Sequence, residues 1–143
     1  MKRVVLLALV LMVAIGVAGC GSPATTDTDT NGTTDGTRGI VEVDPAKAEE
    51  LIATDRDLVV IDVSGRWSEG RLVGALDTPL AELDAIIKGN YTLNASKHYI
   101  VYSRDEESSK QGAQRLLDSS FSVVYRLVGG FDAWVAYGGY VEQ

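Results

Sequence analysis

Cysteine, histidine and long apolar segments are scarce in this chain, and each scarcity excludes a kind of structure. Cys20 is the only cysteine, so the chain cannot form an intramolecular disulfide. His98 is the only histidine, so the ligand set of a usual zinc site is missing and we expect no metal. The longest apolar run, residues 4–17, has fourteen residues including Gly16 and is shorter than the ~20 that span a bilayer.

Basic residues are also few. The chain has 13 Lys and Arg against 20 Asp and Glu, which gives a formal charge of −7. Lys2 and Arg3 lie in a segment that we expect to be removed, and their loss changes the formal charge to −9. A surface of this sign repels nucleic acid and anionic lipid headgroups. We therefore expect no nucleic-acid partner, and any membrane attachment must come from something other than a basic patch.

The first twenty residues are typical of an export signal. Lys2 and Arg3 provide a basic start, and the apolar run that follows has the ~7–15 residues of a signal-peptide core. The run leads into Val17-Ala18-Gly19-Cys20, which resembles the lipobox of bacterial lipoproteins. The resemblance implies that the signal peptide, residues 1–19, is removed and that Cys20 is lipidated.

Lipidation of Cys20 would determine where the protein resides. Two or more acyl chains give stable anchoring, so we expect an exported protein that is held on a bacterial membrane in the cell envelope. Two alternatives remain, namely an ordinary cleaved signal with an incidental cysteine and an uncleaved anchor. If Cys20 is lipidated, the mature protein has no free thiol.

Residues 21–38 are dominated by Thr, Asp and Gly and have no apolar side chain able to build a core. Such a composition cannot offset its ordering entropy by burial, so we expect disorder. A flexible coil of this length spans about 23 Å on average. The sequence thus predicts three parts: the leader 1–19, a lipidated tether 20–38 and a folded domain 39–143.

The predicted folded domain alternates short apolar runs with amphipathic segments. Continuous β-branched or aromatic runs predict buried strands at 58–62, 99–102 and 123–125. Amphipathic spacing predicts helices at 45–54, 80–89 and 108–118, and after Gly129-Gly130. This alternation predicts an α/β fold whose parallel sheet is covered by helices on both faces. Ligands of such sheets bind beyond the carboxyl ends of the strands, where Asp62 and Ser103 lie.

Four segments resemble the rhodanese-like domain family. In chain order they are LVVIDV at 58–63, WSEGRLVGA at 67–75, YIVYS at 99–103 and LVGGFDAW at 127–134. Each segment is weak alone, but together they cover nearly all of the predicted domain in the right order. The resemblance implies a three-layer sandwich with about five parallel strands and helices on both faces, which agrees with the pattern above.

Three features depart from the family pattern. The loop between Asp62 and Trp67 is shorter than in the family, and Arg71 stands where histidine is usual. By resemblance, Asp62 and Arg71 border the pocket. The active loop usually begins with cysteine and often closes with arginine. Here it reads Ser103-Arg104-Asp105-Glu106-Glu107-Ser108.

The serine bears directly on activity. In the family, a thiolate takes a sulfane sulfur, for example from thiosulfate, and passes it to an acceptor. Thiolate character makes cysteine reactive, whereas a serine hydroxyl is a weak nucleophile without an adjacent base and cannot hold a persulfide. We therefore predict a catalytically silent domain that has no cofactor. We expect this domain to bind a protein or peptide. The alternative is a sulfurtransferase whose thiol comes from a partner or substrate.

The acidic residues of the loop predict weak anion binding. Such loops hold anions through backbone N–H groups and the positive end of the next helix. Asp105, Glu106 and Glu107 oppose this, and within the loop only Arg104 balances them. The alternative is that these acids only favour the helix N-terminus and that Ser103 only ends a strand.

Other chemistries fit the sequence less well. A serine hydrolase would need a base near Ser103, but His98 lies five residues upstream on the same predicted strand, about 16 Å away, and the G-x-S-x-G elbow is missing. Phosphatases of the same fold need a cysteine, and the calcium-loop spacing D-x-D-x-D-G is absent. We expect His98 to lie at a strand edge, and Trp67 and Trp134 to pack in or near the core.

Overall fold

The structure is a computed structural model that describes residues 39–89 and 93–143. The predicted leader 1–19, the lipidation site Cys20 and the tether 20–38 therefore lie outside the described residues. Within the described ranges, no helix has both the length and the apolar character needed to cross a membrane.

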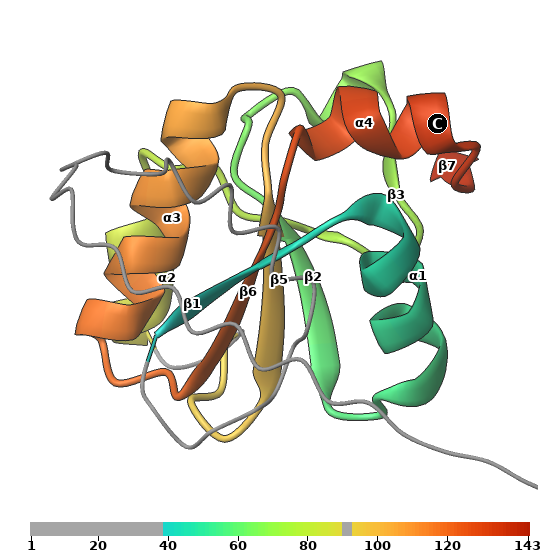
Figure 1. Cartoon of the computed structure of the whole chain (residues 1–143). Helices are drawn as coiled ribbons and strands as arrows, with labels where there is room; N and C mark the ends of the chain where they lie inside the picture. Colours follow the sequence, from blue (N-terminus) through green and yellow to red (C-terminus); the bar gives the residue numbers. More distant parts are fainter. Residues whose placement is uncertain (1–38, 90–92) are drawn as a thin grey trace, which may run out of the picture. The chain divides into compact units, whose positions relative to one another are not determined.

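A five-stranded sheet with the strand order β1-β6-β5-β2-β4 forms the centre of the domain (Figure 1). Every neighbouring pair in this sheet is parallel. The predicted parallel sheet is thus confirmed. The strands are β1 (Ile40–Val43), β2 (Leu58–Asp62), β4 (Leu76–Asp77), β5 (His98–Tyr102) and β6 (Val123–Leu127).

Helices cover both faces of this sheet, as predicted (Figure 1). One apolar cluster packs between the sheet and helices α1 and α4, and includes Ala48, Tyr102 and Trp134. A second cluster packs between the sheet and helices α2 and α3, and includes Leu83 and Leu116. The helices are α1 (Pro45–Thr54), α2 (Leu83–Gly89), α3 (Glu106–Asp118) and α4 (Gly130–Tyr137).

The helix starts follow from local hydrogen bonds. The Asp44 side chain accepts the Lys47 backbone N–H at 2.8 Å, and Pro45 supplies the first-turn φ, so α1 begins as predicted. Helix α2 begins three residues later than predicted because residues 80–82 form a turn, in which the Leu80 N–H donates to the Val63 carbonyl at 3.1 Å. Helix α3 begins two residues earlier than predicted, since Asp105 caps it.

A small antiparallel pair of strands, which the sequence did not predict, forms a second sheet beside the main one. It joins β3 (Arg71–Leu72) to β7 (Val141–Glu142), close to the end of the chain. A short 3-10 helix, η1 (Trp67–Glu69), precedes β3. These elements place the 67–72 segment beside the carboxyl end of the main sheet, which is where Ser103 follows β5.

Candidate functional site

Ser103 lies buried immediately after β5 and is held by its own loop and by α4. Its side chain is fully buried, and its Oγ donates to Asp105 Oδ2 at 3.3 Å. Its carbonyl accepts the Phe131 N–H at 3.0 Å. A Cβ on Gly130, whose φ is +55°, would lie 2.0 Å from that carbonyl oxygen. Glycine is therefore required at position 130, because only a residue without a Cβ lets the start of α4 contact the Ser103 backbone so closely.

Asp105 occupies the N-terminal end of α3. Its Oδ1 accepts the Ser108 backbone N–H at 2.7 Å, and its Oδ2 accepts the Ser103 hydroxyl. The hydrogen bond from the Ser108 amide lowers the pKa of the Asp105 carboxyl below its usual value. Because α3 begins at Glu106, only Ser103, Arg104 and Asp105 of the six loop residues are outside the helix. A side-chain carboxylate thus lies where the loop would hold an external anion.

Glu106 and Glu107 have different surroundings. Glu106 forms an ion pair with Arg126 Nη1, and its Oε1 accepts the Gly129 N–H at 2.6 Å. The hydrogen bond from Arg126 lowers the pKa of Glu106. Glu107 is exposed and accepts from Gln111 Nε2 at 2.8 Å. The cation that pairs with a loop acid is thus Arg126, which lies outside the loop, whereas Arg104 pairs with Glu69.

Sequence reasoning missed Arg126. This residue lies in β6 and is only 3% exposed, and its Nη2 also pairs with Glu42 at 2.6 Å. No sequence signal distinguished it, because a single arginine inside an apolar strand has no local pattern that reveals its partners. A buried guanidinium with two carboxylate partners ties β1, β6 and the start of α3 together.

Arg104 lies across the mouth of the loop. Its guanidinium carbon is 3.9 Å from the centre of the Phe131 ring, and its Nη2 donates to the Gly70 carbonyl at 2.9 Å. The side chain is only 16% exposed. Arg104 thereby joins the Ser103 loop to α4 and to the 67–72 segment, and together with the burial of Ser103 it closes the site.

The residues expected at the pocket edge make internal contacts. Asp62 is 1% exposed, and its Oδ2 accepts the Tyr102 hydroxyl at 3.1 Å. Burial raises the pKa of Tyr102 well above its usual value, so this hydroxyl remains a donor. Arg71 stacks on Trp67 at 4.4 Å, and its Nε pairs with Glu142 at 3.2 Å. Both residues lie beside the Ser103 loop in the fold, but both Asp62 carboxylate oxygens and two of the three Arg71 nitrogens already have partners.

A shallow hollow of about 380 Å³ lies beside α1 and β2, away from the loop. None of its lining residues belongs to the 103–108 segment. It is lined by Ile52, Leu58, Val59, Val60, Val73, Gly74 and Leu76. Because this hollow contains no polar side chain, it offers no chemistry of its own. We therefore base the site on the residues around Ser103.

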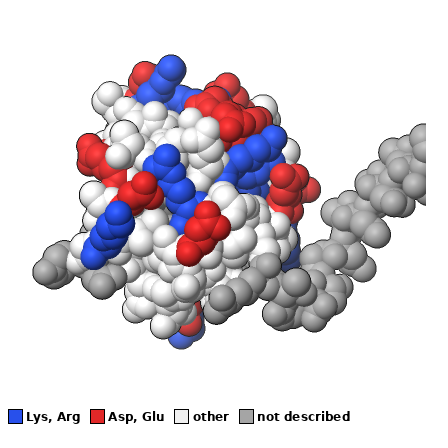
Figure 2. Space-filling view, turned by 90° about the vertical axis from the view of Figure 1, so that its left-hand side faces the viewer, with Lys and Arg blue, Asp and Glu red and all other residues white. Residues whose placement is uncertain are grey.

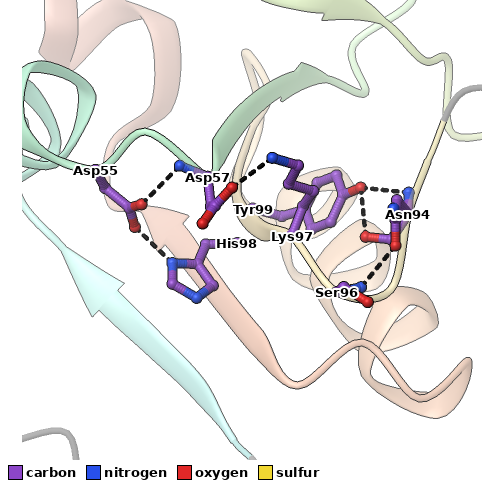
Figure 3. A network of polar contacts seen from close by, with 7 residues as sticks. All are labelled: Asp55, Asp57, Asn94, Ser96, Lys97, His98 and Tyr99. Carbon is purple, nitrogen blue, oxygen red and sulfur yellow. Dashed lines mark hydrogen bonds and ion pairs between the residues drawn. The ribbon is translucent and has the colours of Figure 1, made fainter.

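The structure does not bring His98 to Ser103. His98 begins β5, whereas Ser103 follows its end. Its Nδ1 lies 2.5 Å from Asp55 Oδ2, in a network at the amino ends of β2 and β5 (Figure 3). Partial burial raises the pKa of Asp55, but the hydrogen bonds from His98 and the Asp57 amide outweigh it and lower that pKa overall. The hydrolase arrangement is thus excluded on geometry.

Both tryptophans pack in or against the core, as expected from the sequence. Trp134 is 4% exposed, and Trp67 packs, half-buried, against the same cluster. On the face that carries α3, acidic and basic side chains are interspersed (Figure 2). In residues 39–89 and 93–143, no three His, Cys, Asp or Glu side chains are grouped as metal ligands.

Comparisons with known proteins agree with this fold. The profile of the rhodanese-like domain family matches residues 44–137. Thiosulfate sulfurtransferase GlpE of Coxiella burnetii (strain RSA 331 / Henzerling II) is 32% identical over 100 residues, which cover 67% of this chain and 88% of the relative. The crystal structure of the Alr3790 protein from Anabaena sp. matches with a TM-score of 0.64 at 26% identity and covers 71% of this chain and 91% of that one. A rhodanese-related protein from Thermoplasma volcanium matches in fold with a TM-score of 0.61 at 22% identity, over 71% and 97% of the two chains. This chain therefore belongs to the rhodanese-like domain family.

Proposed function

We propose that this protein is a cell-envelope lipoprotein whose rhodanese-like domain is catalytically silent and binds a protein or peptide. The observation that carries the proposal is the contact between Ser103 and Asp105. Ser103 stands at the family's nucleophile position, is fully buried and donates its hydroxyl hydrogen to a carboxylate. The acceptor of this hydroxyl is a carboxylate whose pKa is lowered, which makes it a poor base for activating an alcohol, and an alcohol cannot carry a sulfane sulfur.

The Asp105 carboxylate also argues against an anionic sulfur donor. It accepts hydrogen bonds from Ser108 and Ser103, and it lies at the positive end of α3. A second anion about 4 Å from this carboxylate would cost up to about 4 kcal/mol at an effective dielectric of 20, and less where water screens it. Thiosulfate therefore has to compete with a group that is already part of the chain.

The anchoring part of the proposal rests on the sequence. The lipobox-like segment ends at Cys20, and lipid on that cysteine would attach the protein to a membrane without a basic patch. The acidic composition, and the mixed charges on the face shown in Figure 2, favour a protein or peptide partner over nucleic acid.

The second candidate is a sulfurtransferase that borrows a thiol from a partner or substrate. It is favoured by the 32% identity to a protein named thiosulfate sulfurtransferase. The burial of Ser103 and the position of Arg104 weigh against it, because an incoming thiol would have to open the loop.

A turnover assay distinguishes the two candidates. The full-length protein, kept in a non-ionic detergent, is supplied with thiosulfate and cyanide, first alone and then with dithiothreitol or glutathione as an external thiol. The silent-domain proposal expects the background rate in every case. A rate that rises with protein concentration only when a thiol is present would support the borrowed-thiol candidate instead.

A further inference from the structure

Two arginines at the mouth of the Ser103 loop share one loosely held counterion. Arg104 Nε and Arg66 Nη1 each lie 3.8 Å from the same oxygen, Glu69 Oε2. This distance exceeds that of a hydrogen bond, so the carboxylate balances both charges but accepts a hydrogen bond from neither of these nitrogens. The Glu69 side chain is 55% exposed and can turn towards solvent.

Arg104 has a buried donor for which the described residues offer no acceptor. Its Nε is inaccessible to solvent and has no hydrogen-bond partner within residues 39–89 and 93–143, a state that it shares with Arg126 Nε. A buried unsatisfied donor is uncommon in folded proteins and calls for an explanation such as a missing ligand oxygen. The stack on Phe131 and the hydrogen bond to the Gly70 carbonyl fix the plane of the guanidinium. The donor is thus held in place before any ligand arrives, which lowers the entropic cost of binding.

Three arginines lie beside the Ser103 loop although the chain as a whole is acidic. Arg71 lies close by, stacked on Trp67 of η1, and pairs with its own carboxylate, Glu142. The 66–71 segment and Arg104 thus contribute three guanidiniums, which contact two carboxylates. The loop acid Asp105 is bound to the Ser108 amide, and Glu106 is paired with Arg126. More distant acids are screened over about 8 Å at physiological ionic strength.

We propose that Arg66 and Arg104 form a carboxylate clamp, and that its occupant is an acidic side chain of a protein partner. This inference rests on the proposed function as a binding module. The incoming carboxylate displaces Glu69, accepts from Arg104 Nε and pairs with Arg66, because the planar guanidinium fork matches carboxylate geometry. Arg104 stacks on Phe131, and arginine beside an aromatic ring is a composition typical of interface centres. An anionic bilayer is the weaker occupant, since Arg104 Nε is buried and a single protruding side chain reaches it more easily than a flat lipid surface does.

The clamp is tested with the full-length protein in non-ionic detergent and a fluorescently labelled oligoglutamate peptide. We expect the labelled peptide to bind, and R104Q and R66Q each to weaken its binding by about tenfold. E69Q removes the internal competitor, whose side chain is 55% exposed, and is expected to strengthen binding several-fold. R56Q makes the same charge change in the turn before β2, at the other end of the sheet, and is expected to leave binding unchanged.

A spectroscopic readout separates the clamp from a structural role of Arg104. In ¹⁵N-labelled wild-type protein, the Arg104 Nε–H resonance is expected to shift downfield when the peptide binds, as that donor gains an acceptor. Equal binding by R104Q and R56Q, or no effect of E69Q, would overturn the clamp while leaving the silent-domain proposal intact. Equal binding of oligoglutamine, of inorganic sulfate, or of glycerophosphoglycerol, the head group of an anionic lipid, in place of the peptide would also overturn it.

Discussion

Ser103 Oγ donates to Asp105 Oδ2 at 3.3 Å, so the residue that we propose to occupy the family's nucleophile position is hydrogen-bonded to a carboxylate of its own loop. The same carboxylate caps α3 through the Ser108 amide at 2.7 Å. The Asp105 carboxylate thereby caps the first turn of α3 and also occupies the helix N-terminus, which would otherwise attract an anion.

The first prediction concerns restoring a thiol. In a C20S background, S103C supplies the only thiol of the chain. We expect S103C alone to give little sulfur transfer from thiosulfate, because Asp105 repels the donor and raises the pKa of the new thiol. S103C/D105N is expected to give more, since asparagine also caps helices but carries no charge. The gain of the double variant over S103C is expected to shrink at high salt, which screens Asp105.

The control for this series is S103C/E107Q. Glu107 is exposed and bonds only to Gln111 among the contacts found in the described residues, so its neutralisation is expected to add little. Full activity from S103C alone would refute the electrostatic part of the account, but it would leave intact the proposal that the Ser103 protein is silent because it lacks the thiol. Equal rates for the two double variants would show that the position of the carboxylate does not matter.

The second prediction concerns Glu106 and the buried Arg126. E106Q removes one of the two carboxylates that neutralise this arginine. We expect the free energy of unfolding, measured by urea denaturation, to fall by about 1–2 kcal/mol, less than the ~3–5 kcal/mol for a fully buried pair because Glu106 is half exposed. E107Q is the matched control and is expected to change stability by less than about 0.5 kcal/mol. Equal effects of the two variants would mean that Arg126 does not depend on Glu106.

The third prediction concerns acid. The folded-state pKa values of Asp55, Asp105 and Glu106 are lowered, so each carboxyl binds its proton more weakly in the folded domain than in the unfolded chain. Their contribution to stability is present above the unfolded pKa, about 4, and is lost as pH falls through the folded values. The urea concentration at the unfolding midpoint is therefore expected to fall steeply as the pH drops below about 4. D55N removes one of the three carboxyls and is expected to make this fall less steep. A flat profile between pH 5 and 3 would contradict the assignment.

The fourth prediction concerns anchoring. C20S is expected to abolish lipid attachment and to leave an unprocessed or mislocalised precursor, because the sulfur that would carry the lipid is gone. Mass spectrometry of the amino-terminal peptide and fractionation of the expressing cells measure both effects. Normal maturation of C20S, together with a wild-type amino terminus that carries no lipid, would contradict the lipoprotein assignment.

Much of the fold could be predicted because its elements carry local signals. Continuous apolar runs identified β2, β5 and β6, and the Asp44-Pro45 pair marked the start of α1. Strands β3, β4 and β7 have two residues each and could not be found, since no periodicity develops over so short a length. The start of α3 was placed too late because Asp105 acts as its cap instead of remaining in an open loop.

The candidate site was predictable in position but not in detail. The rule that ligands bind beyond the carboxyl ends of strands placed Asp62 and Ser103 correctly in one region of the fold. The partners of Arg104, Glu106 and Arg126 come from segments up to 84 residues away, as with Arg126 and Glu42, and no local sequence signal reports such pairings. The closure of the site by its own side chains therefore became apparent only from the structure.

The most direct test of the silent-domain account is the intact mass of the protein with Ser103 retained, after incubation with thiosulfate. The C20S background is used so that no thiol is present anywhere in the chain, and S103C/D105N in the same background serves as the positive control. The account predicts an unchanged mass for the Ser103 protein and the gain of one cyanide-removable sulfur atom for the control. A cyanide-removable sulfur atom on the Ser103 protein would contradict the account.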